Sequence, residues 1–407
     1  MIDIKALRRD PQTLLAQLAR KGAEKTAQEL IDVDGAWRAA TERAEVLRAQ
    51  QKKQAGKPSE AELAELARRK EELHRVAEEL ATLERQRQEL LDRIPNPPFA
   101  DVPSGGEDDF DVVKEVGARP TFAFPVRDHV SLTEAAGWVD AVRGTKVSGS
   151  RFVYRIGPLA LLEMAIYRFA MQRVVEQGHT PVLPPVLVRK EAMYGTGFFP
   201  TDAVNIYEVE RDELFLVGTS EVPLAALHTD EILDELPRRY VGLSTCFRRE
   251  AGAAGKDTGG MFRVHQFEKV EMFVCCLPEN SRAEHERLLE IEESLVKALG
   301  VPYRVINTAA GDLGVPAAKK YDIEAWFPAQ QRYREITSTS NTTDFQARRL
   351  GIRFRRDGKP EVLHTLNGTA VTARAMLAVL ENFQEADGSV AIPEALWEFG
   401  APRRMEP

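Results

Sequence analysis

Residues 30–93 contain a single proline, Pro58, and this scarcity of helix breakers constrains the fold more than any other feature of the chain. Apolar and small side chains recur there in alternating steps of four and three, the spacing of a coiled-coil seam. Gly56 and Pro58 interrupt the pattern, and Ser59 with Glu62 forms a capping box for a second helix. The segment therefore predicts an antiparallel two-helix coiled coil. Its seam residues are Val33, Trp37, Ala40, Ala44, Leu47, Leu63, Leu66, Leu73, Leu80, Leu83 and Leu90, with Lys70 and Ala77 at intermediate seam positions.

The predicted hairpin is too long to be covered by one compact domain. A helix of about 34 residues reaches roughly 50 Å, so we expect the hairpin to project into solvent. A dimerisation coiled coil, a spacer and an arm that binds nucleic acid all remain compatible with this segment. The next stretch, RIPNPPFADVPSGGEDDFD, has the prolines, glycines and acids of a linker. We expect an N-terminal domain over residues 1–103, with the arm at about 30–93, and a second domain over residues 104–407.

The second domain alternates helical and strand patterns. A helix is expected after Pro158 and ends at Gly178, and the prolines of the following TPVLPPVLV favour an edge or interface strand. ELFLVG, RRYVGLSTCFRRE and FRVHQFEKVEMFVCC have the composition of strands, and the last two form a long hairpin. The predicted fold class is α+β, with helices packed on an antiparallel sheet.

The amino-acid composition bears on the size of the core, the possible metal sites and the cellular location of the protein. With 407 residues and 43% hydrophobic content, the chain can bury a sizeable core. Its three cysteines lack the spacing of a disulfide framework or a zinc site. Neither a secretory signal nor a membrane span is expected from the sequence, so we expect a cytoplasmic protein without a membrane partner. The net charge of −8 leaves nucleic-acid binding undecided, because local basic surfaces can coexist with an acidic average.

The stretch FRREAGAAGKDTGG, residues 247–260, resembles a phosphate-binding loop at first sight. A P-loop requires Gly, four residues and then Gly-Lys-Ser/Thr, but Asp257 follows Lys256 and Glu250 stands where the first glycine belongs. The flanking strands are more informative. Phe267 and Glu271 share a strand face about 13–14 Å apart, and Arg248 ends the partner strand. One elongated ligand could contact all three, although a solvated arginine and a core phenylalanine are the common alternatives.

These residues lie in a segment that resembles motif 2 of the class II aminoacyl-tRNA synthetases, in its seryl-tRNA synthetase form. Four further segments resemble that family in order: VSGSRF at 147–152 (entry to motif 1), GTSEVPL at 218–224 (amino-acid loop), YREITSTSNTTDFQARR at 333–349 (metal and ATP strand) and LNGTAVTARAMLAVLENFQ at 366–384 (motif 3). The hairpin resembles its tRNA-binding arm. The resemblance covers nearly the whole chain and implies a class II antiparallel catalytic core in a homodimer.

The resemblance implies roles for residues that match the motifs. Arg248 holds the ATP α-phosphate and the serine carboxylate, Glu250 reads adenine, and Phe267 stacks on the ring. Arg374 binds the γ-phosphate, and Glu335 with Ser338 are the implied Mg²⁺ ligands, for which hard oxygen donors are suited. The full implied ATP set is Arg248, Arg249, Glu250, Val264, Phe267, Glu335, Ile336, Thr337, Ser338 and Arg374, and the implied catalytic residues are Arg248, Arg374 and Glu335.

The same resemblance implies a serine pocket and a two-step reaction. Glu271 accepts the proton of the substrate hydroxyl, and the loop residue Lys256 approaches the tRNA end. Seryl-adenylate forms from L-serine and ATP, and the seryl group then passes to tRNA(Ser), with selenocysteine tRNA as a further candidate acceptor. The implied serine residues are Thr219, Ser220, Glu221, Arg248, Glu271 and Thr369.

One departure from the family pattern and two rival functions bear on this assignment. The four residues AVTA between Thr369 and Arg374 are one fewer than the family pattern, which predicts a shift of one position for either residue. An ATP-dependent ligase that loads amino acids on a carrier protein should lack the arm. A non-catalytic paralogue that serves as a nucleic-acid-binding or coiled-coil scaffold should have lost Arg248, Glu335 or Arg374, and all three are present.

Overall fold

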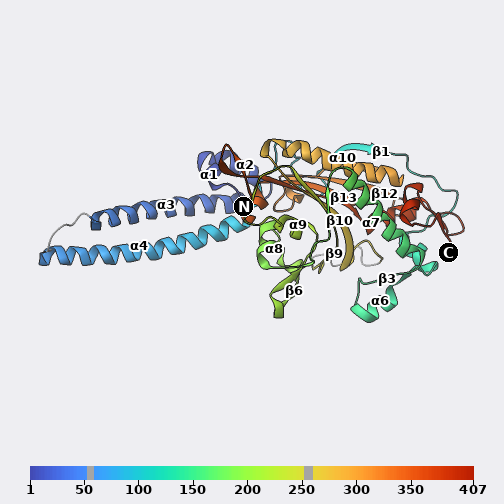
Figure 1. The fold of residues 1–407 in the computed structure, drawn as a ribbon, viewed down its shortest axis with the longest axis horizontal. Coiled ribbons are helices and arrows are strands. Elements are labelled where there is room, and N and C mark those ends of the chain that lie inside the picture. Colours follow the sequence, from blue (N-terminus) through green and yellow to red (C-terminus); the bar gives the residue numbers. More distant parts are fainter. Residues whose placement is uncertain (53–58, 252–259) are drawn as a thin grey trace. The chain divides into compact units, whose positions relative to one another are not determined.

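The computed structural model describes residues 1–52, 59–251 and 260–407, and the chain divides into two compact units, Met1–Pro97 and Pro98–Pro407 (Figure 1). The division falls before the expected boundary at residue 103. Part of the linker belongs to the second unit, because the Phe99 amide donates to the Ala318 carbonyl at 2.9 Å and Val102 is buried in a cluster with Leu313. Lys256, with its predicted approach to tRNA, lies outside the described residues.

In the described residues of the N-terminal unit there are four helices, and the last two form the predicted hairpin. The first long helix begins earlier than residue 30, because the left-handed Gly22 (φ 69°) ends the preceding turn and no breaker follows it. The Gly56–Pro58 break and the side chain of Glu62 lie outside the described residues. The helices are α1 (Ile4–Arg9), α2 (Pro11–Ala19), α3 (Glu24–Lys52) and α4 (Glu60–Arg93).

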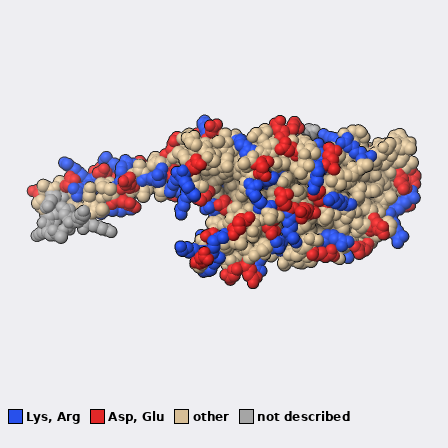
Figure 2. Space-filling model, turned by 90° about the horizontal axis from the view of Figure 1, so that it is seen from above, with Lys and Arg blue, Asp and Glu red and all other residues tan. Residues whose placement is uncertain are grey.

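Two apolar clusters hold the N-terminal unit together. One joins α1 and α2 to the base of the hairpin, where Leu7, Leu18, Leu30 and Ile94 are buried. The other lies between α3 and α4 and is small, so the hairpin depends on a narrow seam as expected for a two-helix coiled coil. In the view of Figure 2, basic and acidic side chains are interspersed along these helices. The seam cluster contains Ala44, Leu47 and Val76, flanked by Leu73 and Leu80.

Asp34 on α3 is buried at the base of the hairpin, with 2% exposure. Its two carboxylate oxygens accept hydrogen bonds from Arg8 of α1 at 2.8 Å each. Arg87 of α4 donates at 2.9 Å, and Arg38 lies 3.3 Å away. One carboxylate therefore ties three helices together. Burial acts to raise the pKa of Asp34, but Arg8 and Arg87 outweigh it, and the pKa is lowered.

We expect Asp34→Ala to destabilise the N-terminal unit by about 2–3 kcal/mol, because it leaves partly buried arginines without their shared anion. A carboxylate with a lowered folded-state pKa stabilises above its unfolded value of about 3.9, and the contribution is lost as pH falls through the folded-state pKa. Amide hydrogen exchange in α1–α4 should therefore differ between wild type and Asp34→Asn at pH 7 and converge in strong acid. The control is Asp32→Asn on an exposed position of α3; equal effects of both variants would contradict the proposed anchor.

An eight-stranded sheet forms the frame of the second unit. Its order is β1-β11-β12-β13-β16-β10-β9-β4, and only the edge pair β4–β9 is parallel. The α+β prediction is confirmed, and so is the edge position of the proline-rich strand. The strands are β1 (Asp111–Val116), β4 (Thr180–Val182), β9 (Arg238–Phe247), β10 (Gln266–Cys276), β11 (Tyr303–Asn307), β12 (Lys319–Phe327), β13 (Arg332–Thr343) and β16 (His364–Thr372).

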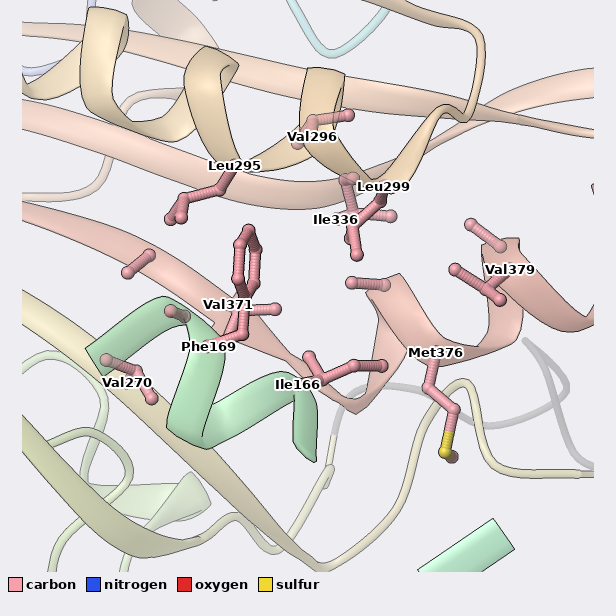
Figure 3. Packing of buried hydrophobic residues seen from close by; sticks show 14 of the residues in the cluster. Ile166, Phe169, Val270, Leu295, Val296, Leu299, Ile336, Val371, Met376 and Val379 are labelled. Carbon is pink, nitrogen blue, oxygen red and sulfur yellow. The ribbon is translucent and has the colours of Figure 1, made fainter. Parts of the chain in front are cut away.

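Three helices cover one face of this sheet: α7 (Pro158–Glu176), α10 (Ser281–Leu299) and α12 (Ala373–Asn382). Figure 3 shows their apolar side chains meeting those of the strands in one core. Polar side chains of the central strands β10, β13 and β16 therefore lie on the opposite face of the sheet. The residues in this view include Ile166 and Phe169 of α7, Leu295, Val296 and Leu299 of α10, Met376 and Val379 of α12, and Val270, Ile336 and Val371 of the sheet.

The strand predicted from Phe262 begins at Gln266 instead, because residues 262–265 bend beside the cleft described below. All three cysteines are buried and free. Within the described ranges, no helix has the length and apolar content needed to cross a bilayer. The remaining elements are α5 (His129–Ala135), α6 (Ala141–Ser148), α8 (Lys190–Thr196), α9 (Glu221–Ala226), α11 (Phe345–Leu350), β2 (Val139–Asp140), β3 (Tyr154–Arg155), β5 (Leu187–Val188), β6 (Tyr207–Val209), β7 (Leu214–Leu216), β8 (Ile232–Leu233), β14 (Arg353–Arg356), β15 (Lys359–Val362), β17 (Val390–Ala391) and β18 (Arg404–Met405).

Candidate active site

An open cleft of about 660 Å³ lies over the central strands, bordered by β10, β13, β16 and the start of α12. Its walls combine aromatic, basic and acidic side chains from segments far apart in the sequence. Such a mixture of a few charged groups and flat apolar surface suits a nucleotide. The lining residues are Arg248, Glu250, Met261, Phe262, Arg263, Val264, Phe267, Lys269, Glu335, Ile336, Thr337, Ser338, Thr369, Thr372, Ala373 and Arg374.

Arg248 stands directly after β9, where the ladder pairs Phe247 with Gln266 of β10. Its Nε donates to the Gly218 carbonyl at 3.2 Å, and its guanidinium carbon lies 5.2 Å from the centre of the Phe267 ring. Within the described part of the chain, its guanidinium makes no other hydrogen bond. Its terminal nitrogens can therefore donate to a planar or tetrahedral anion in the cleft.

Glu250 turns back toward the cleft because its backbone is left-handed, with φ of 52°. The side chain lines the cleft, and its Oε2 accepts a hydrogen bond from Arg263 Nη1 at 2.7 Å. Arg263 comes from the bend before β10, so the ion pair joins the two sides of the hairpin. A carboxylate held in this way presents an acceptor at one end of the cleft.

Glu335 and Ser338 are three positions apart on β13, which in a regular strand would place them on opposite faces. The register of β13 against β12 shifts at this point, from Ile323↔Thr337 to Glu324↔Glu335. Ile336 is the extra residue of a β-bulge, and its side chain joins Thr337 on the face toward α10. The bulge consequently places both Glu335 and Ser338 on the cleft face.

Arg374, in the first turn of α12, reaches across the cleft to β13. Its Nη1 donates to the Glu335 carbonyl at 3.2 Å and to Glu335 Oε1 at 3.1 Å, and its guanidinium carbon lies 4.8 Å from the centre of the Phe262 ring. Burial acts to raise the pKa of Glu335, but Arg374 and then Lys320 outweigh it, and the pKa is lowered. Glu335 is therefore an ionised carboxylate at neutral pH.

At one end of the cleft, Lys269 of β10 and Thr369 of β16 line the wall and contact the buried Glu271 behind them, and we call these three residues the small polar pocket. Glu271 is 1% exposed. Its Oε2 forms an ion pair with Lys269 Nζ at 2.6 Å and accepts a hydrogen bond from Thr369 Oγ1 at 3.1 Å. A second bulge makes this contact possible, because the ladder passes from Val270↔Val371 to Glu271↔Thr369 and leaves Ala370 as the extra residue. The pocket thus offers a buried carboxylate and a threonine hydroxyl to a small polar ligand.

The short AVTA segment does not displace either neighbour from the cleft. Ala370 and Val371 both enter the core under the sheet, so Thr369 and Thr372 both face the cleft. The next turn carries Arg374 into the same cleft. The structure therefore brings together the two residues for which a shift of one position was expected.

Thr219, Ser220 and Glu221 lie at the N-terminus of α9, beside the small polar pocket. Thr219 Oγ1 accepts from the Glu221 amide at 3.1 Å, and Ser220 Oγ donates to the Gly242 carbonyl at 3.4 Å. Glu221 Oε1 accepts from two side-chain amides, Gln346 at 2.7 Å and Asn367 at 2.9 Å. Burial, followed by the nearby Glu271, raises the pKa of Glu221 to about 7.

Comparisons with known proteins agree with this geometry. Residues 206–383 match the sequence profile described as the tRNA synthetase class II core domain (G, H, P, S and T), and residues 1–98 match that of the seryl-tRNA synthetase N-terminal domain. A protein of Thermobifida fusca named serine–tRNA ligase is 51% identical, over 98% of this chain and 97% of its own. The chain belongs to the seryl-tRNA synthetase family.

Solved structures of other seryl-tRNA synthetases have the same fold. That of the Pyrococcus horikoshii enzyme complexed with ATP is 40% identical, with a TM-score of 0.94 and full coverage of both chains. That of the cytoplasmic serine–tRNA ligase of Naegleria fowleri with AMP is 31% identical, with a TM-score of 0.87 over 98% of this chain and 96% of that one. The class II catalytic fold predicted from the motifs is therefore confirmed.

Most residues assigned from the family motifs meet at one cleft, but not all of their side chains point into it. Arg249 is exposed and its guanidinium carbon lies 5.8 Å from the Tyr207 ring, outside the cleft lining. Ile336 and Thr337 border the cleft while their side chains turn toward α10. The individual assignments to ATP, serine and metal stay predictions.

The sequence analysis missed six of the residues that line the cleft: Met261, Phe262, Arg263, Lys269, Thr372 and Ala373. Strand alternation could have found Lys269, because it lies between Phe267 and Glu271 on the face already singled out. Arg263 and Phe262 precede the regular strand, so no periodicity predicts their direction. Phe262 nevertheless places its ring within 4.8 Å of the Arg374 guanidinium carbon.

Proposed function

We infer that the chain is an ATP-dependent serine–tRNA ligase, which activates L-serine with ATP and transfers the seryl group to tRNA(Ser). The observation that carries this function is the layout of one cleft. Two arginines, Arg248 and Arg374, lie on opposite sides of it, and it ends at Thr369, whose hydroxyl is bonded to the buried Glu271. Phosphate binds between the arginines, and the small polar pocket receives an amino acid.

The reaction then has two steps. A serine carboxylate oxygen attacks the α-phosphorus of ATP, the bond to the β-phosphate oxygen breaks, and seryl-adenylate and pyrophosphate form. A terminal ribose hydroxyl of the tRNA next attacks the seryl carbonyl carbon, loses its proton and releases AMP. Neither step needs a protein nucleophile, so catalysis comes from positioning and from neutralising charge on phosphate.

Arg248 binds the α-phosphate and the serine carboxylate, since its terminal nitrogens are available and its Nε is anchored. Phe267 stacks on the adenine, and Glu250 accepts from the exocyclic amine. Arg374 binds the γ-phosphate from the other side of the cleft. This arrangement bends the triphosphate and exposes its α-phosphorus to the serine carboxylate.

Glu335 and Ser338 would hold Mg²⁺ on the cleft face of β13. An ionised carboxylate and a hydroxyl are the hard oxygen donors that this ion prefers, and phosphates and water commonly complete its shell. Within the described residues, no cluster of three or more His, Cys, Asp or Glu side chains is arranged to hold a metal, so the chain alone offers a partial shell. Bound Mg²⁺ would neutralise phosphate charge.

The buried pair Glu271–Thr369 supports recognition of serine by its hydroxyl. Glu271 accepts the hydroxyl proton, whereas alanine and glycine would leave this carboxylate without that partner. Hydrogen-bonded recognition of this kind discriminates by roughly 10⁴–10⁵. Threonine is excluded by lack of room for its methyl group. Thr219 and Glu221, with Ser220 fixed between them, bind the amino group at the mouth of the pocket.

The arm and the surface of α7 support the two macromolecular partners. The arm binds tRNA(Ser), and selenocysteine tRNA remains a further candidate acceptor. A second copy of the chain covers the apolar side chains exposed around α7, which include Leu161 (54% exposed), Met164 (62%) and Leu183 (83%). The protein is therefore a homodimer in this proposal. Its cytoplasmic location stays a prediction.

The test is ATP–pyrophosphate exchange measured with serine, threonine, alanine and glycine. We expect exchange with serine and a kcat/KM at least about 10³-fold lower for alanine and glycine. Glu271→Ala should remove most of this preference, because the hydroxyl then lacks its acceptor. Glu268→Ala, which alters the neighbouring carboxylate on the opposite strand face, is the control. No exchange with any amino acid would exclude the ligase and favour a non-catalytic scaffold.

A further inference from the structure

Glu292, in the middle of α10, is a carboxylate without solvent contact, with 0% exposure. Its Oε2 accepts one hydrogen bond, from Thr337 Oγ1 of β13 at 3.0 Å. Its Oε1 has no partner among the described residues. Burying a carboxyl group with so little compensation costs several kcal/mol in general, about 2–7 for a polar group without its hydrogen bonds. Burial of Glu292 therefore lowers the stability of the fold, which favours a purpose for its hydrogen bond to Thr337 other than stability.

In the described chain, two other acidic residues of α10, Glu284 and Glu293, form ion pairs with basic side chains, whereas Glu292 does not. Glu284 forms an ion pair with Arg239 at 2.5 Å. Glu293 contacts Lys114 at 2.7 Å and accepts from the Tyr303 hydroxyl at 2.7 Å. Glu292 makes no ion pair within the described ranges, and its single hydrogen bond leads to the strand that borders the cleft. The hydrogen bond to Thr337 is therefore the one polar contact through which Glu292 can act on the cleft, within the described residues.

Thr337 belongs to the bulge that sets the direction of Glu335 and Ser338. The side chains of Ile336 and Thr337 both point to the sheet face that packs on α10. Because two consecutive residues share that face, Glu335 before them and Ser338 after them both lie on the cleft face. The ladder between β13 and β16 runs from Thr339 to Thr343, so the bulge lies beyond its end. Thr337 has no ladder partner on β16 in the described part of the chain, and its side chain is held instead by its hydrogen bond to the Glu292 carboxyl group.

Gly368 of β16 shows how closely the carboxyl is packed. A Cβ at this position would lie 2.8 Å from Glu292 Oε1 and 3.1 Å from Thr339 Oγ1. A side chain there would push Glu292 away from Thr337 or the strands apart. The carboxyl group therefore fills a fixed space between α10, β13 and β16, and small displacements of it would be transmitted to the bulge.

We propose that Glu292 is a positioning residue for the ATP site: by accepting the Thr337 hydroxyl it holds the β13 bulge that presents Glu335 and Ser338 to Mg²⁺ and ATP. Glu292 lies under the sheet and touches neither substrate. Its effect passes through one hydrogen bond and one backbone irregularity. This inference rests on the proposed roles of Glu335 and Ser338, and the experiment below separates the two.

The variants are Glu292→Ala, Glu292→Gln and Thr337→Val, with Glu290→Ala at an exposed position of α10 as the control. We expect Glu292→Ala to raise the KM for ATP and the Mg²⁺ concentration for half-maximal exchange by about 10-fold or more, as loss of an outer partner of a metal ligand does. The KM for serine should change by less than about twofold, because the Glu271–Thr369 pocket is untouched. Glu292→Gln should restore most of the loss, since its amide can still bond Thr337.

A second measurement does not depend on activity: the rise in melting temperature that ATP causes, with and without Mg²⁺. In Glu292→Ala and Thr337→Val, the Mg²⁺-dependent part of the rise should fall, and the part due to ATP alone should remain. Glu290→Ala should behave as wild type. If wild type shows the Mg²⁺-dependent rise without serine-dependent exchange, the ligase function fails while the role of Glu292 is still decided by this comparison.

The role of Glu292 is overturned if a folded Glu292→Ala keeps the wild-type response to Mg²⁺ and ATP, or if its KM for serine rises as much as that for ATP. Should Glu292→Ala not fold, Thr337→Val decides, because it removes the hydroxyl and nearly keeps the volume. A Thr337→Val variant with unchanged Mg²⁺ dependence then contradicts the proposal. The same loss as expected for Glu292→Ala supports it.

Discussion

Arg248→Ala is expected to lower serine-dependent ATP–pyrophosphate exchange by at least about 10³-fold, the effect of removing an arginine from a phosphoryl transition state. The wild-type guanidinium is anchored through Nε to the Gly218 carbonyl and lies over Phe267, so it is fixed in place before substrate arrives. Arg248→Lys should recover a small part of the rate, because an ammonium restores the charge without the planar fork.

The control for this prediction is Arg238→Ala at the start of β9, the strand that Arg248 follows. The Arg238 side chain is 43% exposed and pairs with Glu235 at 3.2 Å. This variant should exchange at nearly the wild-type rate. Arg249→Ala separates two readings of the motif. The motif assigns Arg249 to ATP, whereas its position over Tyr207 predicts little loss. Full exchange by Arg248→Ala would contradict the proposed phosphate site.

Periodicity predicted the elements whose geometry is regular. Steps of four and three correctly placed Ala44, Leu47, Leu73 and Leu80 in the seam between α3 and α4. The prediction was wrong for Leu63, which is 54% exposed, and for Ala77, because the neighbouring Val76 is the buried residue. Alternation along β10 predicted that Phe267 and Glu271 share a face, and Lys269 between them belongs to the same face. Counting residues is enough where a single repeat governs the segment, as it does along β10.

Counting residues fails at the two bulges. Glu335 and Ser338 are three positions apart, and so are Thr369 and Thr372, which regular strands would send to opposite faces. Only the extra residues Ile336 and Ala370 bring each pair to the cleft. Resemblance to a family could assign Glu335, Ser338 and Thr369 to the site, but the physical reason why each pair shares a face is visible only in the register of the sheet.

The net charge of the chain did not predict how acidic and basic side chains are distributed over the surface. Acidic and basic side chains are interspersed over the visible face of the molecule (Figure 2). A net charge of −8 therefore does not describe the arm, where ion pairs such as Arg43–Glu79 (2.6 Å) occur across the hairpin. The case for tRNA as the partner of the arm rests on the family and on the exposed helix pair, and it can be tested directly.

Shortening the arm should separate the two steps of the reaction. Residues 44–78 can be replaced by a short glycine-rich turn, because Arg43 and Glu79 face each other across the hairpin. This variant keeps the Asp34 anchor and the apolar cluster at the base of the hairpin. We expect serine-dependent exchange within about twofold of wild type, since the Pro98–Pro407 unit has its own core and contains the whole cleft.

Charging of tRNA(Ser) by this variant should fall by about 10² in kcat/KM, because contacts of basic side chains with the phosphate backbone supply much of the affinity for nucleic acid. The loss should shrink when the salt concentration is raised, since wild type then loses the same contacts by screening. Asp32→Asn in the full-length arm is the control for changes at its base. An equal loss of exchange and charging would show that the arm stabilises the catalytic unit, and unchanged charging would assign tRNA binding elsewhere.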